Sequence, residues 1–513
     1  MNGAELLIRA AVSTGIEYCF ANPGTTEMPL VAAMEAEPSL KPILSMFEGV
    51  CTGAADGYGR IAERPALTLT HLGPGFANGI ANLHNARRAN SPIVNVVGDH
   101  ASWHVNYDPP LASDIESLAR PVSGWVRTSR SASGIGEDFI SAVRAAWQPS
   151  GQVATLMLPM DLQAAAVEGQ LEPVKVTAPR RTFNGDAVES VAREVRAGKR
   201  LVFIVGDNGL SEAGLRAAGR LSQIEGVKLF AETFPRVSYR GGGLPDLDRL
   251  PYFPEKAIAA LNQYDYVVCA GVPEPISYFG YEGLPSRLAS EDRLLSLAQV
   301  GEDVVGALAA LAEAVEAPQP IELEGRVSLP DPQAELTPHS IAEVVAAGLP
   351  EDCIVSVEGG TCGYPFFTAS AHAAKHRVMT NTGGAIGQGI PAALGAALAE
   401  RGNTVVCLQS DGSAQYTIQA LWTIAREQLP VVILIVANHR YGILQNELRR
   451  YGITEFGPQS LALTELDKPR VDWQALSQGY GVPAVRVQTN AELAGEFTEA
   501  CAAKEPRLIE MVL

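Results

Sequence analysis

The residues best able to do chemistry lie near the carboxyl end of the chain. Asp411 follows one apolar run, and Asn438 follows a second one 27 positions later, with an amphipathic stretch between them. This pattern predicts a parallel β-α-β unit, which places both residues at the carboxyl ends of neighbouring strands, where open α/β sheets bind ligands. A carboxylate and an amide oxygen suit Mg²⁺ that also carries phosphate oxygens. The amides of Gly412 and Ser413, at a helix start, are expected to face those phosphates.

Three further candidates lie in the first part of the chain. Glu48 stands between an apolar run and a predicted helix rich in small residues, where burying a carboxylate is costly without a partner. His71 and Thr25 each follow a predicted strand, so both are expected to face the same cleft. The imidazole of His71 is suited to proton transfer near neutral pH, although a packed or capping role is the alternative.

Two glycine-containing stretches could approach a ligand closely. Residues 381–389 place Gly384 among other glycines, with one bulky apolar residue, Ile386. Gly360 and Thr361 follow an apolar run and could offer an amide and a hydroxyl to a phosphate, or could form a plain turn. A dinucleotide-binding loop is the competing interpretation of residues 381–389, but the order of strand, glycines and helix that it requires is poorly met.

Together these stretches resemble those of thiamine-diphosphate (ThDP) dependent enzymes. The family's metal motif reads Gly-Asp-Gly, a spacer of similar length and Asn, and it is matched from Ser410 to Asn438 with serine in place of the first glycine. The family's pyrimidine motif, Glu-x-x-x-x-Gly-x-Ala-Asp-Gly-Tyr, is matched from Glu48 to Tyr58. The resemblance implies that Glu48 hydrogen-bonds the aminopyrimidine ring and that Ile386 wedges between the two rings of the cofactor.

The resemblance also assigns roles to the remaining candidates. It implies that the metal oxygens come from the side chains of Asp411 and Asn438 and from the backbone carbonyl of Arg440. The implied catalytic residues are Glu48, His71 and Thr25. The implied cofactor contacts are Gly384, Ile386, Gly360, Thr361, Gly412, Ser413, Tyr441, Gly442 and Ile443.

The length and the alternation of elements predict the fold. At 513 residues the chain is too long for one core and suggests three domains. Predicted strands alternate with helices throughout, which indicates an α/β fold of three doubly wound parallel sheets. The resemblance names residues 1–175 the pyrimidine-binding domain, 186–318 the central domain and 338–513 the diphosphate-binding domain. Linkers are expected near residues 165–190 and at 316–336, where charged residues and proline accumulate.

Within the family, the chain resembles the branch of acetolactate synthase and benzoylformate decarboxylase. The stretch after His71 is similar to the synthase loop, whereas the turn around Thr25 is similar to that of the decarboxylase. Two residues depart from the decarboxylase: Phe279 stands where that enzyme has a second histidine, and Glu447 where it has an aromatic residue. An unpaired carboxylate would be costly in a pocket lined for a phenyl group.

The resemblance implies an acetolactate-synthase-like decarboxylase or carboligase that depends on ThDP and Mg²⁺ and acts on a small 2-oxo acid such as pyruvate. The alternatives are a benzoylformate-decarboxylase-like enzyme that releases an aldehyde, and a non-catalytic ThDP-fold binding or regulatory subunit. The chain carries no clear signature of the flavin FAD, which acetolactate synthase binds in its central domain. A homodimer or homotetramer with active sites at subunit interfaces is also implied.

Composition disfavours several other classes. The net charge of −18 argues against a nucleic-acid partner, which needs clustered lysine and arginine. No apolar run is long enough to span a bilayer and no secretory signal is apparent, so we expect no membrane partner. The seven cysteines are scattered without a C-x-x-C pair, which indicates reduced core thiols of a cytoplasmic protein.

Overall fold

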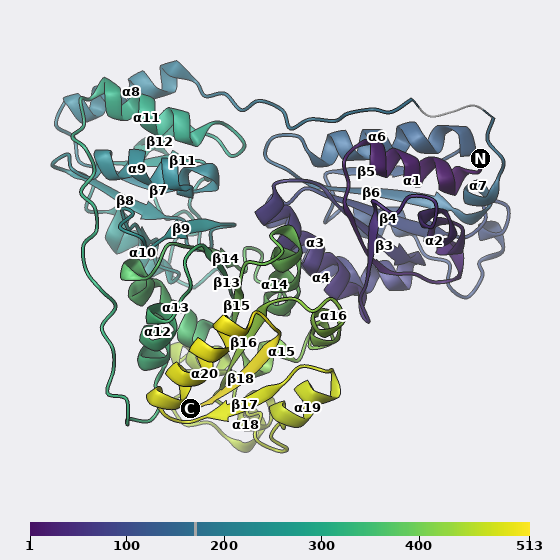
Figure 1. Cartoon of the computed structure of the whole chain (residues 1–513). Helices are drawn as coiled ribbons and strands as arrows, with labels where there is room; N and C mark the ends of the chain where they lie inside the picture. Colours follow the sequence, from purple (N-terminus) through teal and green to yellow (C-terminus); the bar gives the residue numbers. More distant parts are fainter. Residues whose placement is uncertain (169–171) are drawn as a thin grey trace.

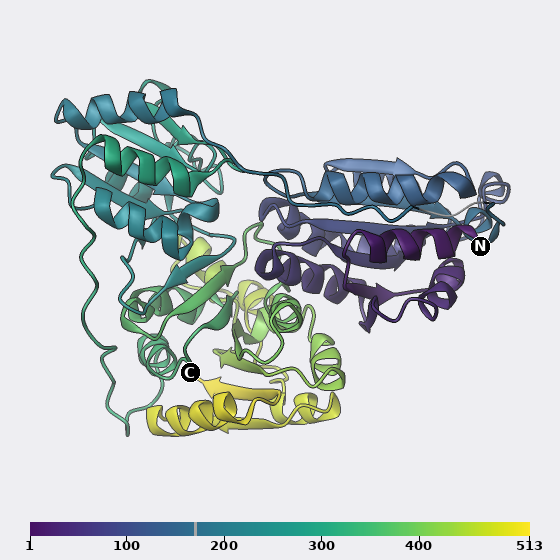
Figure 2. The same ribbon diagram turned by 45° about the horizontal axis from the view of Figure 1, so that its top comes forward.

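The computed structural model describes residues 1–168 and 172–513 and contains three α/β sheets that follow one another along the chain (Figure 1). Among the described strands, one neighbouring pair alone is antiparallel. Helices cover both faces of the sheets, as Figures 1 and 2 show for the first and third. The predicted α/β fold of three doubly wound parallel sheets is confirmed.

The first sheet is six-stranded, with the order β2-β1-β3-β4-β6-β5. Because β2 and β3 flank β1, the strand order reverses between β1 and β3, and ligands bind outside the carboxyl ends of strands at such a switch point. Its strands are β1 (Tyr18–Asn22), β2 (Lys41–Leu44), β3 (Ala66–His71), β4 (Ile93–Asp99), β5 (Trp125–Thr128) and β6 (Val153–Pro159). The helices of this part are α1 (Gly3–Ser13), α2 (Met28–Met34), α3 (Glu48–Ala62), α4 (Leu72–Arg88), α5 (Ile115–Ala119), α6 (Ile135–Ala146) and α7 (Met160–Ala164).

The third sheet repeats this plan with seven strands in the order β17-β18-β16-β15-β13-β14-β9. Its switch point lies between β13 and β15, since β14 and β15 flank β13. The strands from this part of the chain are β13 (Cys353–Val357), β14 (His376–Thr380), β15 (Val405–Ser410), β16 (Val431–Ala437), β17 (Ala484–Val487) and β18 (Arg507–Val512). The helices are α12 (Pro338–Ala347), α13 (Gly360–Ala369), α14 (Gly389–Ala399), α15 (Asp411–Ala414), α16 (Ala420–Arg426), α17 (Gly442–Arg450), α18 (Pro458–Thr464), α19 (Trp473–Gly479) and α20 (Asn490–Ala503).

The central sheet has five strands in the order β10-β8-β7-β11-β12. Its strands are β7 (Leu201–Val205), β8 (Val227–Ala231), β10 (Asp248–Arg249), β11 (Tyr266–Ala270) and β12 (Leu294–Ala298), and its helices are α8 (Gly185–Arg196), α9 (Glu212–Leu221), α10 (Pro254–Leu261) and α11 (Val304–Ala314). One strand from this stretch, β9 (Ser238–Arg240), does not join the central sheet but pairs antiparallel with β14 at the edge of the third sheet.

The two predicted linkers differ in what the structure shows of them. Residues 318–336 contain no helix or strand and run along the outside of the molecule from the central sheet to the third (Figures 1 and 2). In the first predicted linker, α8 begins at Gly185, and residues 169–171 lie outside the part that the structure describes.

The first and third sheets share one hydrophobic core. Along β16, Ile433 packs into the core that also contains Phe20 of β1, while Val432 packs into a separate core on the other face of the sheet. Helices α3 and α14 meet inside the shared core, where a Cβ on Gly57 would lie 2.1 Å from the carbonyl oxygen of Ala392. The small residues predicted on one face of α3 therefore allow its close approach to α14.

No helix in residues 1–168 and 172–513 is both long and apolar enough to cross a bilayer. All seven cysteines are buried and unpaired. Burial raises the pKa of the Cys19 thiol to about 12, which keeps it in its unreactive protonated form.

Candidate functional site

Asp411 begins α15 directly after β15, and its side chain is buried. Its Oδ1 accepts a hydrogen bond from the amide of Gly412 at 2.8 Å, and its Oδ2 accepts one from the amide of His439 at 2.6 Å. Burial raises the pKa of this carboxyl group, and the amides oppose that effect. Within the described residues, its one partner at ion-pair distance is His439, whose Nδ1 lies 3.8 Å from Asp411 Oδ2. A bound cation would compensate a buried carboxylate in this setting.

Asn438 lies beside Asp411, as predicted, because β15 and β16 are parallel neighbours. Its Nδ2 donates a hydrogen bond to Thr361 Oγ1 at 3.2 Å, and its Oδ1 accepts one from the amide of Arg440 at 3.2 Å. His439, between them, has a φ of +54°, so the chain turns sharply after the strand. The role of the Arg440 carbonyl as a metal ligand stays a prediction.

The start of α13 completes this group. Gly359 precedes the helix and Gly360 is its first residue, so the first amides of α13 have no partner within the helix and lie beside the switch point. A helix start rather than a plain turn therefore follows β13. Ser410, which replaces the family's first glycine, has an extended backbone (φ −110°), so the position does not require glycine. A Cβ on Gly359 would lie 2.7 Å from Ser410 Oγ, so Gly359 leaves room for that side chain.

These groups fit a divalent cation that carries a diphosphate. Asp411 and Asn438 supply hard oxygen ligands, and the unpaired amides at the start of α13 suit phosphate oxygens. Tyr441 precedes α17, and a Cβ on Gly412 would lie 2.5 Å from its ring, so the ring packs on the turn that holds Asp411. Ile443, in the first turn of α17, is half-exposed.

The loop at residues 381–389 is held by a carboxylate that the sequence analysis missed. Glu358, the residue after β13, accepts hydrogen bonds from the amides of Gly387 at 2.5 Å and Gly389 at 2.6 Å, and from Gln409 Nε2 at 2.6 Å. Burial raises the pKa of Glu358, and these donors oppose that effect. The available signal was a charged residue at the end of an otherwise apolar strand.

The same loop presents Ile386. Gly384 and Gly387 have φ values of +75° and +100°, which side chains rarely adopt, so the glycines are needed for its path. Ile386, between them, is 41% exposed, although the loop is pinned on both sides. An exposed apolar side chain on a fixed loop fits a wedge against a bound ring.

Glu48 begins α3, and its side chain is buried at 8% exposure. Its Oε2 accepts a hydrogen bond from Asn78 Nδ2 of α4 at 3.0 Å. A Cβ on Gly75 would lie 3.0 Å from its Oε1, so α4 packs directly on the carboxylate. Asn78 is the partner that burial requires, and the sequence analysis did not identify it.

His71 ends β3 and is oriented by a second carboxylate that the sequence analysis missed. Its Nδ1 lies 2.8 Å from Oε2 of Glu27 and 3.1 Å from Oγ1 of Thr26. Glu27 is fully buried and also accepts a hydrogen bond from the amide of Gly24 at 2.7 Å, while the His71 side chain is 24% exposed. With Nδ1 engaged, Nε2 is the nitrogen left for a ligand. Thr25 is exposed, and the hydroxyl that meets His71 belongs to its neighbour Thr26.

The two groups of candidate residues remain separate within one chain. In residues 1–168 and 172–513, no hydrogen bond or ion pair joins Glu48 or His71 to the group around Asp411. Each group has large exposed apolar side chains in neighbouring segments. These are Met28, Met46, Trp103 and Tyr107 in the first part, and Ile386, Tyr416, Ile443 and Leu444 in the third.

The two departures from the decarboxylase are differently placed. Phe279 is 62% exposed. Glu447 lies on α17, where its Oε2 accepts a hydrogen bond from Tyr281 Oη at 3.4 Å and lies 3.8 Å from Arg450 Nε. Glu447 therefore has partners in Tyr281 of the central part of the chain and Arg450 of its own helix.

A cleft of about 920 Å³ lies at the carboxyl ends of β7, β8 and β11, and Thr382 and Gly383 of the 381–389 loop also line it. Glu232, directly after β8, and Asp207, after β7, are among the residues that line it. Burial raises the pKa of Glu232 to about 8, and the charge of Asp207 adds to this effect, whereas the guanidinium of Arg236 opposes it.

Replacing Glu232 with glutamine is expected to flatten the dependence of stability on pH. The folded state holds the Glu232 proton up to about pH 8, but the unfolded state releases it near its ordinary pKa of 4.5, so stability falls as pH rises between these values. Thermal unfolding should show Glu232→Gln more stable than the wild type at about pH 9 and nearly equal to it at about pH 5. Exposed Glu225→Gln is the control, and an equal change at both pH values for Glu232→Gln would contradict the assignment.

Comparison with known proteins gives this geometry a family. Residues 1–118 match the model "Thiamine pyrophosphate enzyme, N-terminal TPP binding domain", and residues 361–511 match its C-terminal counterpart. Thiamine pyrophosphate is the same compound as ThDP.

Two curated relatives and one solved structure cover nearly the whole chain. A Mycobacterium tuberculosis protein named "Putative acetolactate synthase large subunit IlvX" is 45% identical over 100% of this chain and 99% of its own length. Benzoylformate decarboxylase of Pseudomonas aeruginosa is 27% identical over 97% of this chain and 96% of its own length. The ThDP-dependent 4-hydroxybenzoylformate decarboxylase of Rhodococcus jostii RHA1 has the same fold, with a TM-score of 0.87 at 23% identity over 100% of this chain and 99% of that one. On the family models and the relative at 45% identity, the chain belongs to the thiamine pyrophosphate enzyme family.

Proposed function

We propose that the chain is a ThDP- and Mg²⁺-dependent decarboxylase or carboligase of small 2-oxo acids such as pyruvate. The observation that carries this proposal is the pair of half-sites at the switch points of the first and third sheets. Asp411 and Asn438, at the ends of neighbouring strands of the third sheet, support binding of a metal-held diphosphate. Glu48 at the start of α3 and His71 at the end of β3 support binding of an aminopyrimidine ring and a substrate.

Each residue has a role that its contacts support. Bound ThDP supplies the carbon nucleophile and electron sink for loss of CO₂ from a 2-oxo acid. Glu48, buried against α4, would hold the aminopyrimidine ring by sharing a proton with it, and Ile386 would support the rings from the fixed loop. His71, with Nδ1 held by Glu27, presents Nε2 to move a proton at the substrate.

A panel of 2-oxo acids tests the proposal. With ThDP and Mg²⁺ added, the purified protein is expected to consume pyruvate faster than benzoylformate, and separation of aldehyde from acyloin products decides between decarboxylation and carboligation. The relative at 45% identity, named as an acetolactate synthase subunit, favours carboligation. A preference for benzoylformate would favour the decarboxylase alternative, which the relative at 27% identity supports. Absence of turnover with every acid would leave a non-catalytic ThDP-binding subunit.

The proposed enzyme contains neither a bound flavin nor a disulfide. A flavin absorbance band in the purified protein would contradict the absence of flavin. All seven thiols are buried and unpaired, which supports a reducing compartment, and we place the enzyme in the cytoplasm.

We further propose a homodimer or homotetramer in which the first part of one subunit and the third part of another complete each site. Mixing Glu48→Gln chains with Asp411→Ala chains tests this, because half of the randomly formed dimers then contain one chain of each kind. Such a dimer has one intact site of two, so about a quarter of the wild-type activity should return. If the mixture is as inactive as its two components, the shared site is wrong.

Glu27→Gln is expected to lower kcat/KM by about ten- to a hundredfold, because a buried hydrogen bond to a charged group contributes about 1.5–3 kcal/mol and here it fixes the imidazole of His71. Steady-state kinetics with ThDP at saturation measure the effect. The control is Glu35→Gln, because Glu35 follows α2 and is exposed. This substitution makes the same change of charge and should leave the kinetics unchanged. Wild-type kinetics in Glu27→Gln would show that Glu27 does not orient His71.

A further inference from the structure

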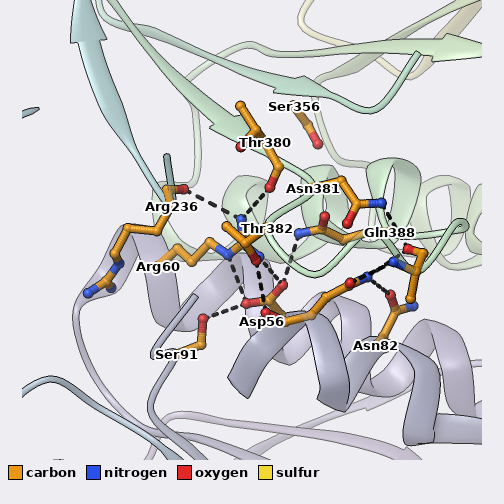
Figure 3. Close-up of polar contacts among 12 residues, drawn as sticks. Asp56, Arg60, Asn82, Ser91, Arg236, Ser356, Thr380, Asn381, Thr382 and Gln388 are labelled. Carbon is orange, nitrogen blue, oxygen red and sulfur yellow. Dashed lines mark hydrogen bonds and ion pairs between the residues drawn. The ribbon is translucent and has the colours of Figure 1, made fainter. Parts of the chain in front are cut away.

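A buried ion pair lies in the middle of α3. Asp56 and Arg60 stand one helical turn apart, and both side chains are fully buried. Arg60 Nε donates to Asp56 Oδ1 at 2.8 Å, and Arg60 Nη2 donates to Asp56 Oδ2 at 2.6 Å (Figure 3). Removing two charges from water costs several kcal/mol per ion, so a contribution to stability does not by itself explain a buried ion pair.

Three further hydrogen bonds of the pair reach into the third part of the chain. Asp56 Oδ2 accepts a hydrogen bond from Gln388 Nε2 at 2.9 Å. Arg60 Nη1 donates to the carbonyl oxygen of Thr380 at 2.7 Å, and Arg60 Nη2 donates to Thr382 Oγ1 at 3.2 Å. Figure 3 shows both ends of the loop at residues 381–389 converging on the pair.

Helix α4 holds the middle of the same loop. Asn85 Nδ2 donates to the carbonyl oxygen of Ala385 at 2.8 Å, and the amide of Ala385 donates back to Asn85 Oδ1 at 3.1 Å. Asn82 Nδ2 donates to the carbonyl oxygen of Gly387 at 3.3 Å. The loop is therefore anchored to two helices of the first part, and Ile386 is the exposed side chain between the anchors.

We infer that Asp56 and Arg60 are positioning residues, which hold the loop through Gln388 and Thr382 so that Ile386 is in place before ThDP binds. The inference rests on the proposed function for the role of Ile386. Helix α3 begins with Glu48, so one rigid element links the carboxylate of one half-site to the loop of the other. Water cannot replace the hydrogen bond between Gln388 and Asp56, because both side chains are buried.

Gln388→Met tests the inference in the full-length protein, since methionine keeps the length of the side chain and removes only its link to Asp56. Ser91→Ala is the matched control, because Ser91 Oγ donates to the same carboxylate at 2.5 Å but has no contact with the loop among its hydrogen bonds. We expect Gln388→Met to weaken ThDP binding in Mg²⁺ about tenfold, and Ser91→Ala to change it less than about twofold. Hydrogen exchange of the amides at residues 383–389, measured without cofactor, should be faster in Gln388→Met alone.

The outcomes separate this inference from the proposed function. Unchanged loop exchange in Gln388→Met, or equal acceleration in Ser91→Ala, overturns the inference even if ThDP binds. Failure of the wild type to bind ThDP overturns the proposed function, while the exchange measurement still tests the loop. If Gln388→Met does not fold, Thr382→Val removes the Arg60 link together with the hydrogen bond from Thr382 Oγ1 to the carbonyl oxygen of Asn85, and Thr382→Ser, which keeps the hydroxyl, should restore wild-type exchange.

Discussion

Glu48→Gln should lower kcat by about a thousandfold while the protein stays folded. Glutamine keeps the shape of the side chain and an oxygen that can accept the Asn78 hydrogen bond, but it cannot share a proton with a ring nitrogen. Positioned acid–base groups contribute about a hundred- to ten-thousandfold to rate, and here the lost proton is the one that activates the cofactor. Pyruvate consumption at saturating ThDP and Mg²⁺ measures the effect.

The control for this variant lies at the other end of the same helix. Glu63, the residue that follows α3, is exposed, so Glu63→Gln changes the net charge equally and should retain full activity. A separate measurement of ThDP affinity distinguishes lost chemistry from lost binding. If Glu48→Gln keeps more than about a tenth of the wild-type kcat, Glu48 is not the activating acid.

The parts of the site that the sequence predicted are those set by regular structure. Asp411 and Asn438 each follow a buried parallel strand, and neighbouring parallel strands end at the same edge of a sheet. The helix that begins at Glu48 could be predicted because α3 passes close to α14, and this close approach requires glycine and alanine on one face of α3. In these places a local pattern in the sequence determines where a side chain lies.

The residues that the sequence analysis missed act through contacts between distant segments. Glu27 meets His71, 44 positions away, and Glu358 meets Gly387, 29 positions away. A single carboxylate in a turn carries no periodicity, so nothing local reveals its partner. The same reason explains why the sequence points to Thr25 rather than to Thr26, since only the fold decides which hydroxyl faces the imidazole.

The pairing of β9 with the third sheet was equally hidden. The strand is three residues long, and its sequence does not show whether it joins the nearer central sheet or the distant β14. Its position beside β14 places the central part of the chain against the segment that leads into the 381–389 loop. The three sheets are thus connected at the loop that carries Ile386, which is where the buried pair of Asp56 and Arg60 also acts.

Asp411→Ala should abolish the joint binding of Mg²⁺ and ThDP. The diphosphate and the Asp411 carboxylate are both negative, so without a cation between them they would repel each other, and the variant loses the cation's strongest ligand. For the wild type, ligand at about a hundred times its dissociation constant should stabilise the protein by about 2.7 kcal/mol, seen as a rise in its unfolding temperature. Asp411→Ala should show no such rise, whereas Asp467→Ala, at a more exposed aspartate of the same part of the chain, should match the wild type.

Removing the metal from the wild type should give the same result as replacing Asp411, the residue expected to bind it. After EDTA treatment, ThDP alone should leave the unfolding temperature unchanged, and added Mg²⁺ should restore the rise, because the carboxylate and the diphosphate attract each other only through the cation. Calorimetric titration of ThDP with and without Mg²⁺ gives the corresponding affinities. Equal ThDP affinity in the two conditions, or a full ligand response in Asp411→Ala, would mean that the diphosphate is held by the helix amides of α13 alone and that Asp411 has another purpose.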